Sequence, residues 1–423
     1  MKQLMLGNAA VARGLYEAGC CVISSYPGTP STEITEEAAK FDDIYCEWAP
    51  NEKVAMEVAF GASLAGKRSF CAMKHVGLNV AADPLFTVAY TGVNAGMVIA
   101  VADDPGMHSS QNEQDSRHYA IAAKLPMLEP ADSAEALAFT RRAYEISEEF
   151  DTPVILKMCT RVAHSQSIVE TSPRTEGPER PYEKNIAKYV MMPGNAIRRH
   201  PVVEDRMRRL AQYAETCDLN RVEMGDTKLG IITSSTSYQY VKEVFGEEAS
   251  VLKLGMVHPM PEGLIRDFAA KVDRLVVVEE LDPIIENYCR QLGLTVSGKE
   301  ALPLEGEFSQ NLVAAKLGGA VPLAMICPKL RTAGDVRRLS SPRTVLHPGK
   351  KQVYRAGRHR LLHPGGGGPS ERHGDDPLHG RLHQRHPRLQ QGIGGEKRGE
   401  DGGRHRRLHL HALWHDRPGQ HRL

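Results

Sequence analysis

The stretch NEKVAMEVAFGASLAG contains a glutamate and a row of small residues at helical spacing. Ala55, Ala59 and Ala62 follow Glu52 by three, seven and ten residues, so they share one side of a predicted helix and permit close packing there. Glu52 stands at the start of this helix, where its carboxylate could reach a bound cofactor. The alternative is a surface glutamate on a packing helix, and this stretch alone leaves both open.

The stretch ISSYPGTPSTE predicts a strand that ends at Tyr26 and a helix that follows it. Gly28 permits a tight turn, and Pro30 suits the first helical position with Thr29 as the N-cap. Ser31 then lies in the first turn, where free backbone N–H groups and the helix dipole favour an anion. The stretch therefore predicts either a pocket for a small carboxylate or simply a well-capped helix start.

Polar residues also follow the predicted strand RSFCAM, in the stretch MKHVGLNVAADP. Lys74 and His75 come directly after this strand, and Asn79 follows shortly after. Because ligands bind at the carboxyl ends of strands in open α/β sheets, these residues are substrate-site candidates, although a structural histidine is the alternative. The later polar loop ADDPGMHSSQNEQDSRH offers Arg117 as a carboxylate clamp, or is simply solvated.

The composition argues against several classes of protein. Of 423 residues, 53 are Lys or Arg and 52 are Asp or Glu, so no excess charge favours a nucleic acid or a membrane surface. No apolar run reaches the length of a membrane span, and the first residues lack the pattern of a signal peptide. The eight cysteines form no C-x-x-C pair. We expect a reduced, cytoplasmic protein with no nucleic-acid and no membrane partner.

Helical and strand patterns alternate over most of the chain, which predicts an α/β fold with largely parallel sheets. In the first region the predicted strands are CCVISSYP, RSFCAM, GMVIAVADD and TPVILKMC. In the second region they are KLGIITSS, SVLKLG and RLVVVEEL, with the predicted helices SYQYVKEVFG and PEGLIRDFAAKV between them. A polar segment between two such regions contains one predicted helix, VVEDRMRRLAQYAE. The predicted segments are a first α/β domain at 1–166, a connector at 167–226, a second α/β domain at 227–325, a degraded segment at 326–357 and a tail at 358–423.

Together, SYPGTPSTE, EWAPNEKVAMEVAFGASLAG and KHVGLNVAADP resemble the alpha subunits of indolepyruvate:ferredoxin oxidoreductases, which are thiamine diphosphate-dependent 2-oxo acid:ferredoxin oxidoreductases. In the second α/β region, LKLGMVHPMPEGLI and VVVEELDPIIE resemble the transketolase C-terminal-like domain of these subunits. The resemblance covers about residues 1–325. It implies a pyrimidine-side thiamine diphosphate-binding domain followed by a transketolase C-terminal-like domain.

The resemblance also implies roles for individual residues. Glu52 would contact the aminopyrimidine ring of thiamine diphosphate and exchange a proton with a ring nitrogen. The residues implied at the cofactor are Tyr26, Pro27, Gly28, Thr29 and Glu52. The residues implied near the substrate are Thr29, Ser31, Lys74, His75, Asn79 and Arg117.

The implied activity is the oxidative decarboxylation of aryl pyruvates to acyl-coenzyme A. Two electrons pass through [4Fe–4S] clusters to ferredoxin, and a beta subunit completes the enzyme. The family binds Mg²⁺ and the diphosphate through Gly-Asp followed by Asn, and the clusters through cysteine runs. Neither motif is present after residue 325, so we predict no metal site in this chain and no activity of the chain alone.

The tail has an unusual composition. Twelve of the 18 histidines lie at or after His347, and Val, Phe, Met, Tyr and Cys are absent after Gly357. A segment with so few apolar residues cannot offset its ordering entropy, so we expect it to be disordered. A metal-binding tail and a basic nucleic-acid arm are two interpretations of this composition.

A shifted reading frame is a third interpretation. Read one base later, codons for GRHRLLHPG, which begins at Gly357, permit GDIGCYTLG, and codons from Glu400 permit TVAVIGDSTFMHSGMTGLANIV after one basic residue. Both strings resemble the family's diphosphate-binding domain and restore its Gly-Asp and Asn. We therefore infer a frameshift near Gly357. A related oxidoreductase with another 2-oxo acid substrate, and a non-catalytic remnant or binding partner, remain alternatives.

Overall fold

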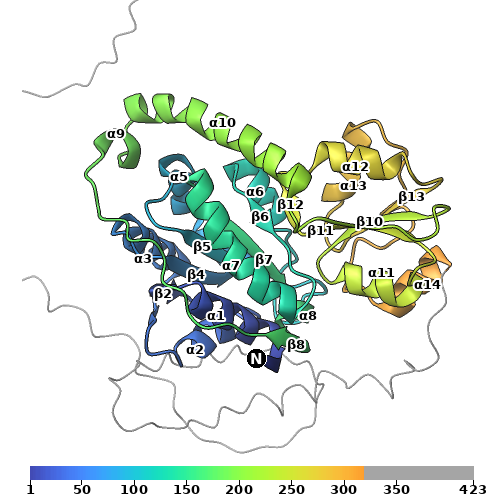
Figure 1. Ribbon diagram of the computed structural model, residues 1–423, viewed down its shortest axis with the longest axis horizontal. Helices are drawn as coiled ribbons and strands as arrows, with labels where there is room; N and C mark the ends of the chain where they lie inside the picture. Colours follow the sequence, from blue (N-terminus) through green and yellow to red (C-terminus); the bar gives the residue numbers. More distant parts are fainter. Residues whose placement is uncertain (319–423) are drawn as a thin grey trace, which may run out of the picture. The chain divides into compact units, whose positions relative to one another are not determined.

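The computed structural model describes residues 1–318, which belong to one compact unit. It confirms the α/β fold, with two mainly parallel sheets and helices packed on them (Figure 1). The segments predicted at 326–357 and 358–423 lie outside the described residues. Within the described part, no helix is both long and apolar enough to cross a membrane.

The first sheet has seven strands in the order β12-β6-β7-β5-β4-β2-β3, and only β12 runs antiparallel to its neighbour. The predicted strands CCVISSYP, RSFCAM, GMVIAVADD and TPVILKMC are confirmed as β2, β4, β5 and β7. The short strands β3 and β6 were not predicted, because YCEW and ML are too short to show a period. The strands are β2 (Val22–Ser25), β3 (Tyr45–Trp48), β4 (Ser69–Lys74), β5 (Met97–Asp103), β6 (Met127–Leu128), β7 (Val154–Cys159) and β12 (Met256–His258).

Both faces of this sheet are buried. In β4, Phe70 and Ala72 belong to the hydrophobic cluster on one face, while Cys71 and Met73 belong to the cluster on the other. Since successive side chains of a strand point to opposite faces, the middle of such a strand is apolar on both sides. One face packs against α1 (Gly7–Glu17), α2 (Thr32–Ala38) and α7 (Ser133–Phe150), and the other against α3 (Glu52–Leu64), α4 (His75–Val80), α5 (Ala82–Thr91) and α6 (Arg117–Ala123).

The second sheet has the order β13-β10-β11-β9, in which only β9 is antiparallel. The predicted strands KLGIITSS, SVLKLG and RLVVVEEL and the two predicted helices between them are confirmed. Helices α11 and α14 pack on one face, and α12 and α13 on the other. The elements are β9 (Arg221–Glu223), β10 (Gly230–Ser234), β11 (Ser250–Leu254), β13 (Leu275–Val278), α11 (Ser237–Phe245), α12 (Glu262–Ala269), α13 (Ile284–Gln291) and α14 (Gln310–Leu317).

The segment between the two sheets contains a long helix, α10 (Pro193–Thr216), which runs along the outside of the first sheet's helices and contacts α5 and α12 (Figure 1). It starts nine residues before the predicted helix, because Pro201 lies within it rather than limiting its start. Arg206 holds it to the first sheet's helices by donating a hydrogen bond to the carbonyl of Ala89 at 2.7 Å. The other elements are β1 (Lys2–Leu6), which pairs with β8 (Gln166–Glu170), and the short helices α8 (Thr160–His164) and α9 (Ile186–Tyr189).

Candidate functional site

Most of the predicted site residues lie at one edge of the first sheet. The parallel strands β2, β3, β4 and β5 end at this edge, and the segments that follow them supply Tyr26 to Ser31, Glu52, Lys74 to Asn79 and the loop at 104–116. These residues are far apart in sequence and meet because parallel strands place their carboxyl ends together.

Glu52 is the first residue of α3, as predicted. Asn51 caps this helix, because its Oδ1 accepts a hydrogen bond from the backbone N–H of Val54 at 3.0 Å. Burial raises the pKa of the Glu52 carboxyl, although its own backbone N–H acts in the opposite direction. The carboxyl therefore retains a proton to higher pH than an exposed glutamate, as suits a group that transfers a proton near neutral pH.

Helix α4 begins against the Glu52 side chain. A Cβ atom at Gly77 would lie only 2.5 Å from Oε1 of Glu52 and 2.9 Å from its Cδ. Residue 77 must therefore be glycine for the carboxyl to keep this position. This contact gives a physical reason for the glycine in the stretch KHVGLNVAADP.

Lys74 is buried at the end of β4. Its Nζ donates a hydrogen bond to the carbonyl of Ser109 at 2.8 Å and lies 3.7 Å from Oδ2 of Asp104. Burial lowers the pKa of Lys74, and the Asp104 carboxylate opposes this effect. Asp104 and Ser109 were not predicted as site residues from the sequence, where the only signal was their position in a polar loop after a strand.

His75 is buried beside Lys74. Its Nε2 lies 3.2 Å from the carbonyl of Asn112, while its Nδ1 is buried without a hydrogen-bond partner in the described chain. An unpaired buried nitrogen is costly unless a ligand or water satisfies it. Asn79, by contrast, is exposed, and its Oδ1 accepts a hydrogen bond from the hydroxyl of Tyr119 at 2.6 Å.

The loop after β2 differs from the prediction. Helix α2 begins at Thr32 rather than at Pro30, and Ser31, not Thr29, is its N-cap residue. Pro30 lies in a turn that precedes the helix, closed by the Ser31 N–H, which donates to the carbonyl of Gly28 at 2.8 Å. The Ser31 hydroxyl is buried and donates to the carbonyl of Gly28 at 2.8 Å, so it stabilises this turn instead of facing an anion.

The same loop nevertheless lies beside the other candidates. A Cβ atom at Gly28 would lie 3.1 Å from Cβ of Lys74, so the loop passes close to β4. The Ser109 hydroxyl is 3.5 Å from the carbonyl of Thr29, which joins the loop to the one after β5. Tyr26 and Pro27 are exposed on this loop.

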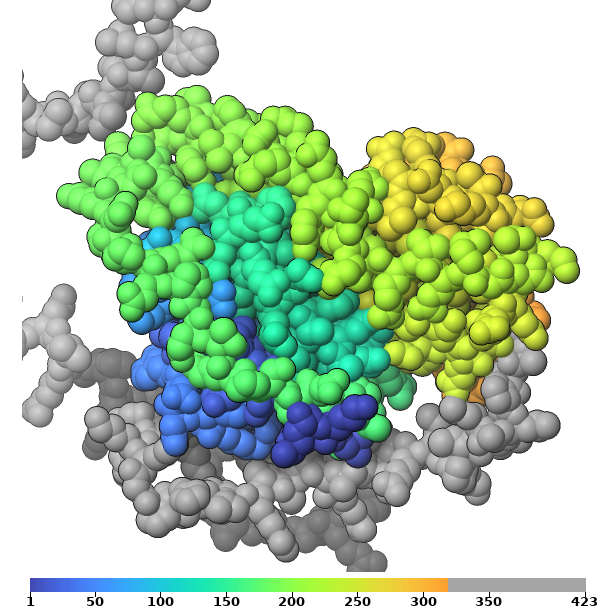
Figure 2. Space-filling view, in the orientation of Figure 1, coloured from blue at the N-terminus to red at the C-terminus, as the bar shows by residue number. Residues whose placement is uncertain are grey.

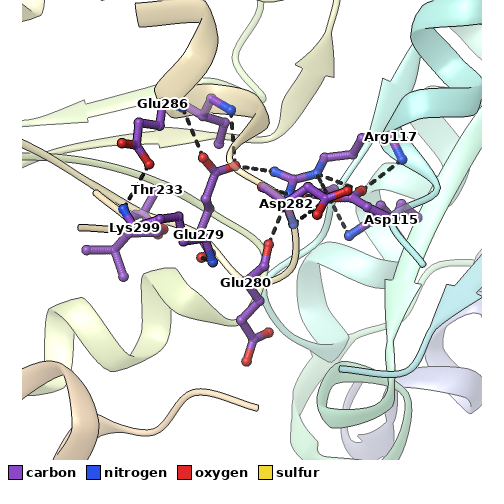
Figure 3. A network of polar contacts seen from close by, with 12 residues as sticks. Asp115, Arg117, Thr233, Glu279, Glu280, Asp282, Glu286 and Lys299 are labelled. Atoms are coloured by element: carbon purple, nitrogen blue, oxygen red, sulfur yellow. Dashed lines mark hydrogen bonds and ion pairs between the residues drawn. The ribbon is translucent and has the colours of Figure 1, made fainter. Parts of the chain in front are cut away.

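Arg117 does not lie free in the site, which corrects its predicted role as a substrate clamp. Its guanidinium is buried between Asp115 and Glu279, with the nearest N–O distances at 2.6 and 2.5 Å (Figure 3). It also donates to the carbonyls of Glu280 and Asp282. The guanidinium thus bonds Asp115 on the first-sheet side and residues just after β13 on the other, so Arg117 joins the two sheets.

The described residues provide no group of three or more His, Cys, Asp and Glu side chains that could hold a metal ion. The seven cysteines in this part of the chain are all free thiols. What the site does provide is a protonatable carboxyl, a buried amine and an imidazole with an unpaired nitrogen. This set suits proton transfer and the binding of a small acid.

Residues 13–224, about half of the chain, match the family model of the thiamine diphosphate-binding part of pyruvate flavodoxin/ferredoxin oxidoreductases. The chain belongs to this family. The family match covers the edge that holds Glu52, Lys74 and His75 and extends through α10.

Individual relatives in this family are named indolepyruvate oxidoreductase subunit IorA. The chain is 42% identical over 335 residues to that of Archaeoglobus fulgidus, which covers 76% of this chain and 54% of the relative. It is 45% identical over 330 residues to that of Methanothermobacter thermautotrophicus, covering 76% and 52%. The chain thus spans about half the length of these relatives.

Among solved structures, a 2-oxoglutarate:ferredoxin oxidoreductase from Magnetococcus marinus, with 2-oxoglutarate, coenzyme A and succinyl-CoA bound, shares the fold. The TM-score is 0.61 at 19% sequence identity, and the match covers 75% of this chain and 65% of that chain. The likeness is one of fold.

Proposed function

We propose that this chain is the part of an indolepyruvate:ferredoxin oxidoreductase alpha subunit that binds the pyrimidine side of thiamine diphosphate. The enzyme would oxidatively decarboxylate aryl pyruvates to acyl-coenzyme A and pass the electrons to ferredoxin. The observation that supports this most directly is Glu52, a partly buried carboxyl with a raised pKa at the start of α3. The similarity to several IorA subunits supports the substrate class.

The residues at this edge fit the pyrimidine part of the cofactor. Thiamine diphosphate, when bound, supplies the carbon nucleophile that decarboxylation of a 2-oxo acid requires. Glu52 would hold a proton at Oε1 or Oε2 and exchange it with a ring nitrogen of the cofactor. Gly77 keeps the carboxyl in place, and the exposed Tyr26 and Pro27 offer apolar surface for the ring.

Substrate recognition is proposed at the neighbouring residues. The Lys74 ammonium would attract the carboxylate of a 2-oxo acid, and the unpaired Nδ1 of His75 would hydrogen-bond the acid or an ordered water. Thr29 is exposed, and its carbonyl lies 3.5 Å from the Ser109 hydroxyl, which the Lys74 Nζ also contacts. Asn79 and Ser31 already make hydrogen bonds within the chain, so any contact of theirs with substrate would have to replace or supplement these.

We assign Mg²⁺, the diphosphate and the [4Fe–4S] clusters to the part of the subunit that lies beyond the inferred frameshift. A beta subunit, ferredoxin and a cytoplasmic location belong to the same proposal. The gene should therefore be resequenced first, from the codon of Leu323 to several hundred bases beyond that of Leu423. A lost or gained base near Gly357 would restore the family's second half, whereas confirmation of the written frame would favour a non-catalytic remnant.

The function is tested with the subunit read in the restored frame and assembled with its partner subunit, which we call the assembled enzyme. We expect coenzyme A-dependent reduction of ferredoxin or a viologen dye by indolepyruvate. The 423-residue chain assayed alone should show none. Oxidation of indolepyruvate by the chain alone, or inactivity of the assembled enzyme with every 2-oxo acid, would contradict the proposal.

A second substrate class is considered because of one relative. The chain is 26% identical to 2-oxoglutarate synthase subunit KorA of Archaeoglobus fulgidus over 96% of that relative's length. A panel of indolepyruvate, phenylpyruvate, pyruvate and 2-oxoglutarate distinguishes the two. A preference for 2-oxoglutarate would retain the reaction type and replace the proposed substrate.

A further inference from the structure

The loop that carries the partners of Lys74 and His75 is contacted by a segment far away in sequence. This loop, residues 104–113, follows β5, and the contacting segment, residues 302–308, lies beyond β13. We infer that Glu307 in this segment is a positioning residue, which holds loop 104–113 against Lys74 and His75 and thereby shapes the substrate side of the site.

The segment is itself firmly anchored. Leu302 and Phe308, the first and last residues of this segment, are both buried in the hydrophobic cluster on one face of the second sheet. The backbone N–H of Phe308 donates a hydrogen bond of 2.7 Å to Oε1 of Glu280. The side chain of Glu280 points away from the Arg117 network, which leaves it available for this contact (Figure 3). The backbone at Glu307 is therefore held in place by its buried and hydrogen-bonded neighbours.

Glu307 connects two parts of the first domain. Its carboxylate accepts two hydrogen bonds from the guanidinium of Arg161 in α8, at 2.8 and 2.6 Å. The same carboxylate lies 3.5 Å from Nε2 of His108 in the loop. The Glu307 side chain is 17% exposed, whereas the Arg161 and His108 side chains are each 52% exposed, so the Glu307 carboxylate is held in a largely buried position while water screens its partners.

The backbone of the segment also touches the loop directly. A Cβ atom at Gly106 would lie 3.2 Å from the backbone nitrogen of Glu307, and Gly106 has a φ of 81°, which favours glycine. The Gly106 N–H donates to Glu113 at 2.6 Å, which closes the loop on itself. A displacement of Glu307 would therefore be transmitted to the whole loop.

The loop in turn contacts the site. Its Ser109 accepts the hydrogen bond from Nζ of Lys74, and the carbonyl of its Asn112 lies beside Nε2 of His75. Asp104 holds the loop closed by accepting hydrogen bonds from Ser109 and Ser110. Continuous contacts thus run from Glu307 to Lys74 without Glu307 approaching the site. The consequence for substrate binding rests on the proposed function, whereas the support of the loop does not.

Hydrogen exchange on the 423-residue chain tests the support itself. The N–H groups of Met107 and Ser109 are hydrogen-bonded within the loop, so peptides spanning 104–113 report its closure. We expect Glu307→Gln to accelerate their exchange about fivefold, because a carboxamide loses the ion pair with Arg161 and weakens the contact with His108. Peptides from α7 should be unchanged. Glu305→Gln, an exposed neighbour, is the matched control.

Arg161→Met provides a second variant, since it removes the same ion pair from the other side, and we expect it to loosen the loop similarly. Unchanged exchange in both variants would overturn the inference.

In the assembled enzyme, Glu307→Gln should raise KM for the 2-oxo acid about fivefold and change kcat less than about twofold. A looser loop with an unchanged KM would overturn the positioning role and leave the proposed function intact. Inactivity of the unaltered assembled enzyme would instead count against the proposed function, and the exchange result would still decide whether Glu307 supports the loop.

Discussion

At the scale of single residues, Glu52 experiences opposing influences on its protonation. A helix N-terminus favours the charged carboxylate, whereas burial favours the neutral acid. The pKa of Glu52 is raised, so burial dominates. A carboxyl that is neutral at higher pH than usual can donate a proton as well as accept one.

The first prediction concerns Glu52→Gln in the assembled enzyme. Glutamine keeps the shape but cannot transfer a proton, so we expect kcat to fall at least about 100-fold with little change in the free energy of unfolding. Glu57→Gln, an exposed residue of the same helix, should leave kcat unchanged. Comparable activity of Glu52→Gln and the unaltered enzyme would exclude the assigned role.

The second prediction concerns Glu280 and pH. Burial raises the pKa of Glu280 to about 7 from an ordinary 4.5, so between these values the folded chain holds a proton that the unfolded chain has lost. The group therefore favours the fold at low pH, and this contribution is lost as pH rises towards 7. The free energy of unfolding should therefore fall between pH 4.5 and pH 7. Because glutamine does not titrate, we expect this fall to be about 1–3 kcal/mol smaller in Glu280→Gln than in the unaltered chain. Urea unfolding at several pH values measures this, and identical pH profiles would refute it.

At the scale of elements, the start of α4 positions the Glu52 side chain. Gly77 in α4 and Glu52 in α3 are 25 positions apart in sequence. They meet because β3 and β4 end at the same edge of the sheet and lead into α3 and α4. No local pattern in the sequence encodes this contact. In the sequence, the only trace of this contact is a glycine at position 77 that local structure does not explain.

The third prediction uses this contact. In Gly77→Ala the new methyl group would displace the Glu52 carboxyl, so we expect kcat to fall about 100-fold while the chain remains folded. Gly61→Ala is the control, because a Cβ atom there meets no atom within 4 Å in the described chain. This control should retain activity and gain about 0.5–1 kcal/mol of stability, since alanine favours a helix. Equal activity of both variants would argue against Gly77 as a support of Glu52.

At the scale of the whole described unit, three features join the two sheets. Strand β12 comes from the second α/β region and pairs with β6 in the first sheet. One hydrophobic cluster contains residues from both sheets. Arg117 forms ion pairs with Asp115 and Glu279 across the junction (Figure 3). In the space-filling view, the two regions are in contact along this junction (Figure 2).

The fourth prediction concerns this junction. Arg117→Met leaves Asp115 and Glu279 buried without their shared partner, so we expect a loss of about 3–5 kcal/mol in the free energy of unfolding. Arg266→Met, which removes an exposed pair with Glu262, should cost less than about 1 kcal/mol. Chemical denaturation of both variants measures the difference. Similar stabilities would mean that the junction does not depend on Arg117.

The sequence by itself determined the elements and the kind of chemistry. Buried strands such as β5 and amphipathic helices such as α7 follow from local periodicity, which acts over a few residues. Glu52, Lys74 and His75 were identified from their positions after predicted strands and from family motifs, and their catalytic and binding roles remain predictions. The short strands β3 and β6 were missed because so few residues show no period.

Only the tertiary structure decided which of these residues meet. It brought Glu307 to the loop that contacts Lys74, assigned Arg117 to the junction between the sheets, and moved the start of α2 to Thr32. The start of α2 follows from the local turn between Gly28 and Ser31, whereas the outcomes for Glu307 and Arg117 depend on contacts between residues distant in sequence. Such contacts are decided by the packing of sheets and helices, and burial and charge pairing then set the state of each side chain.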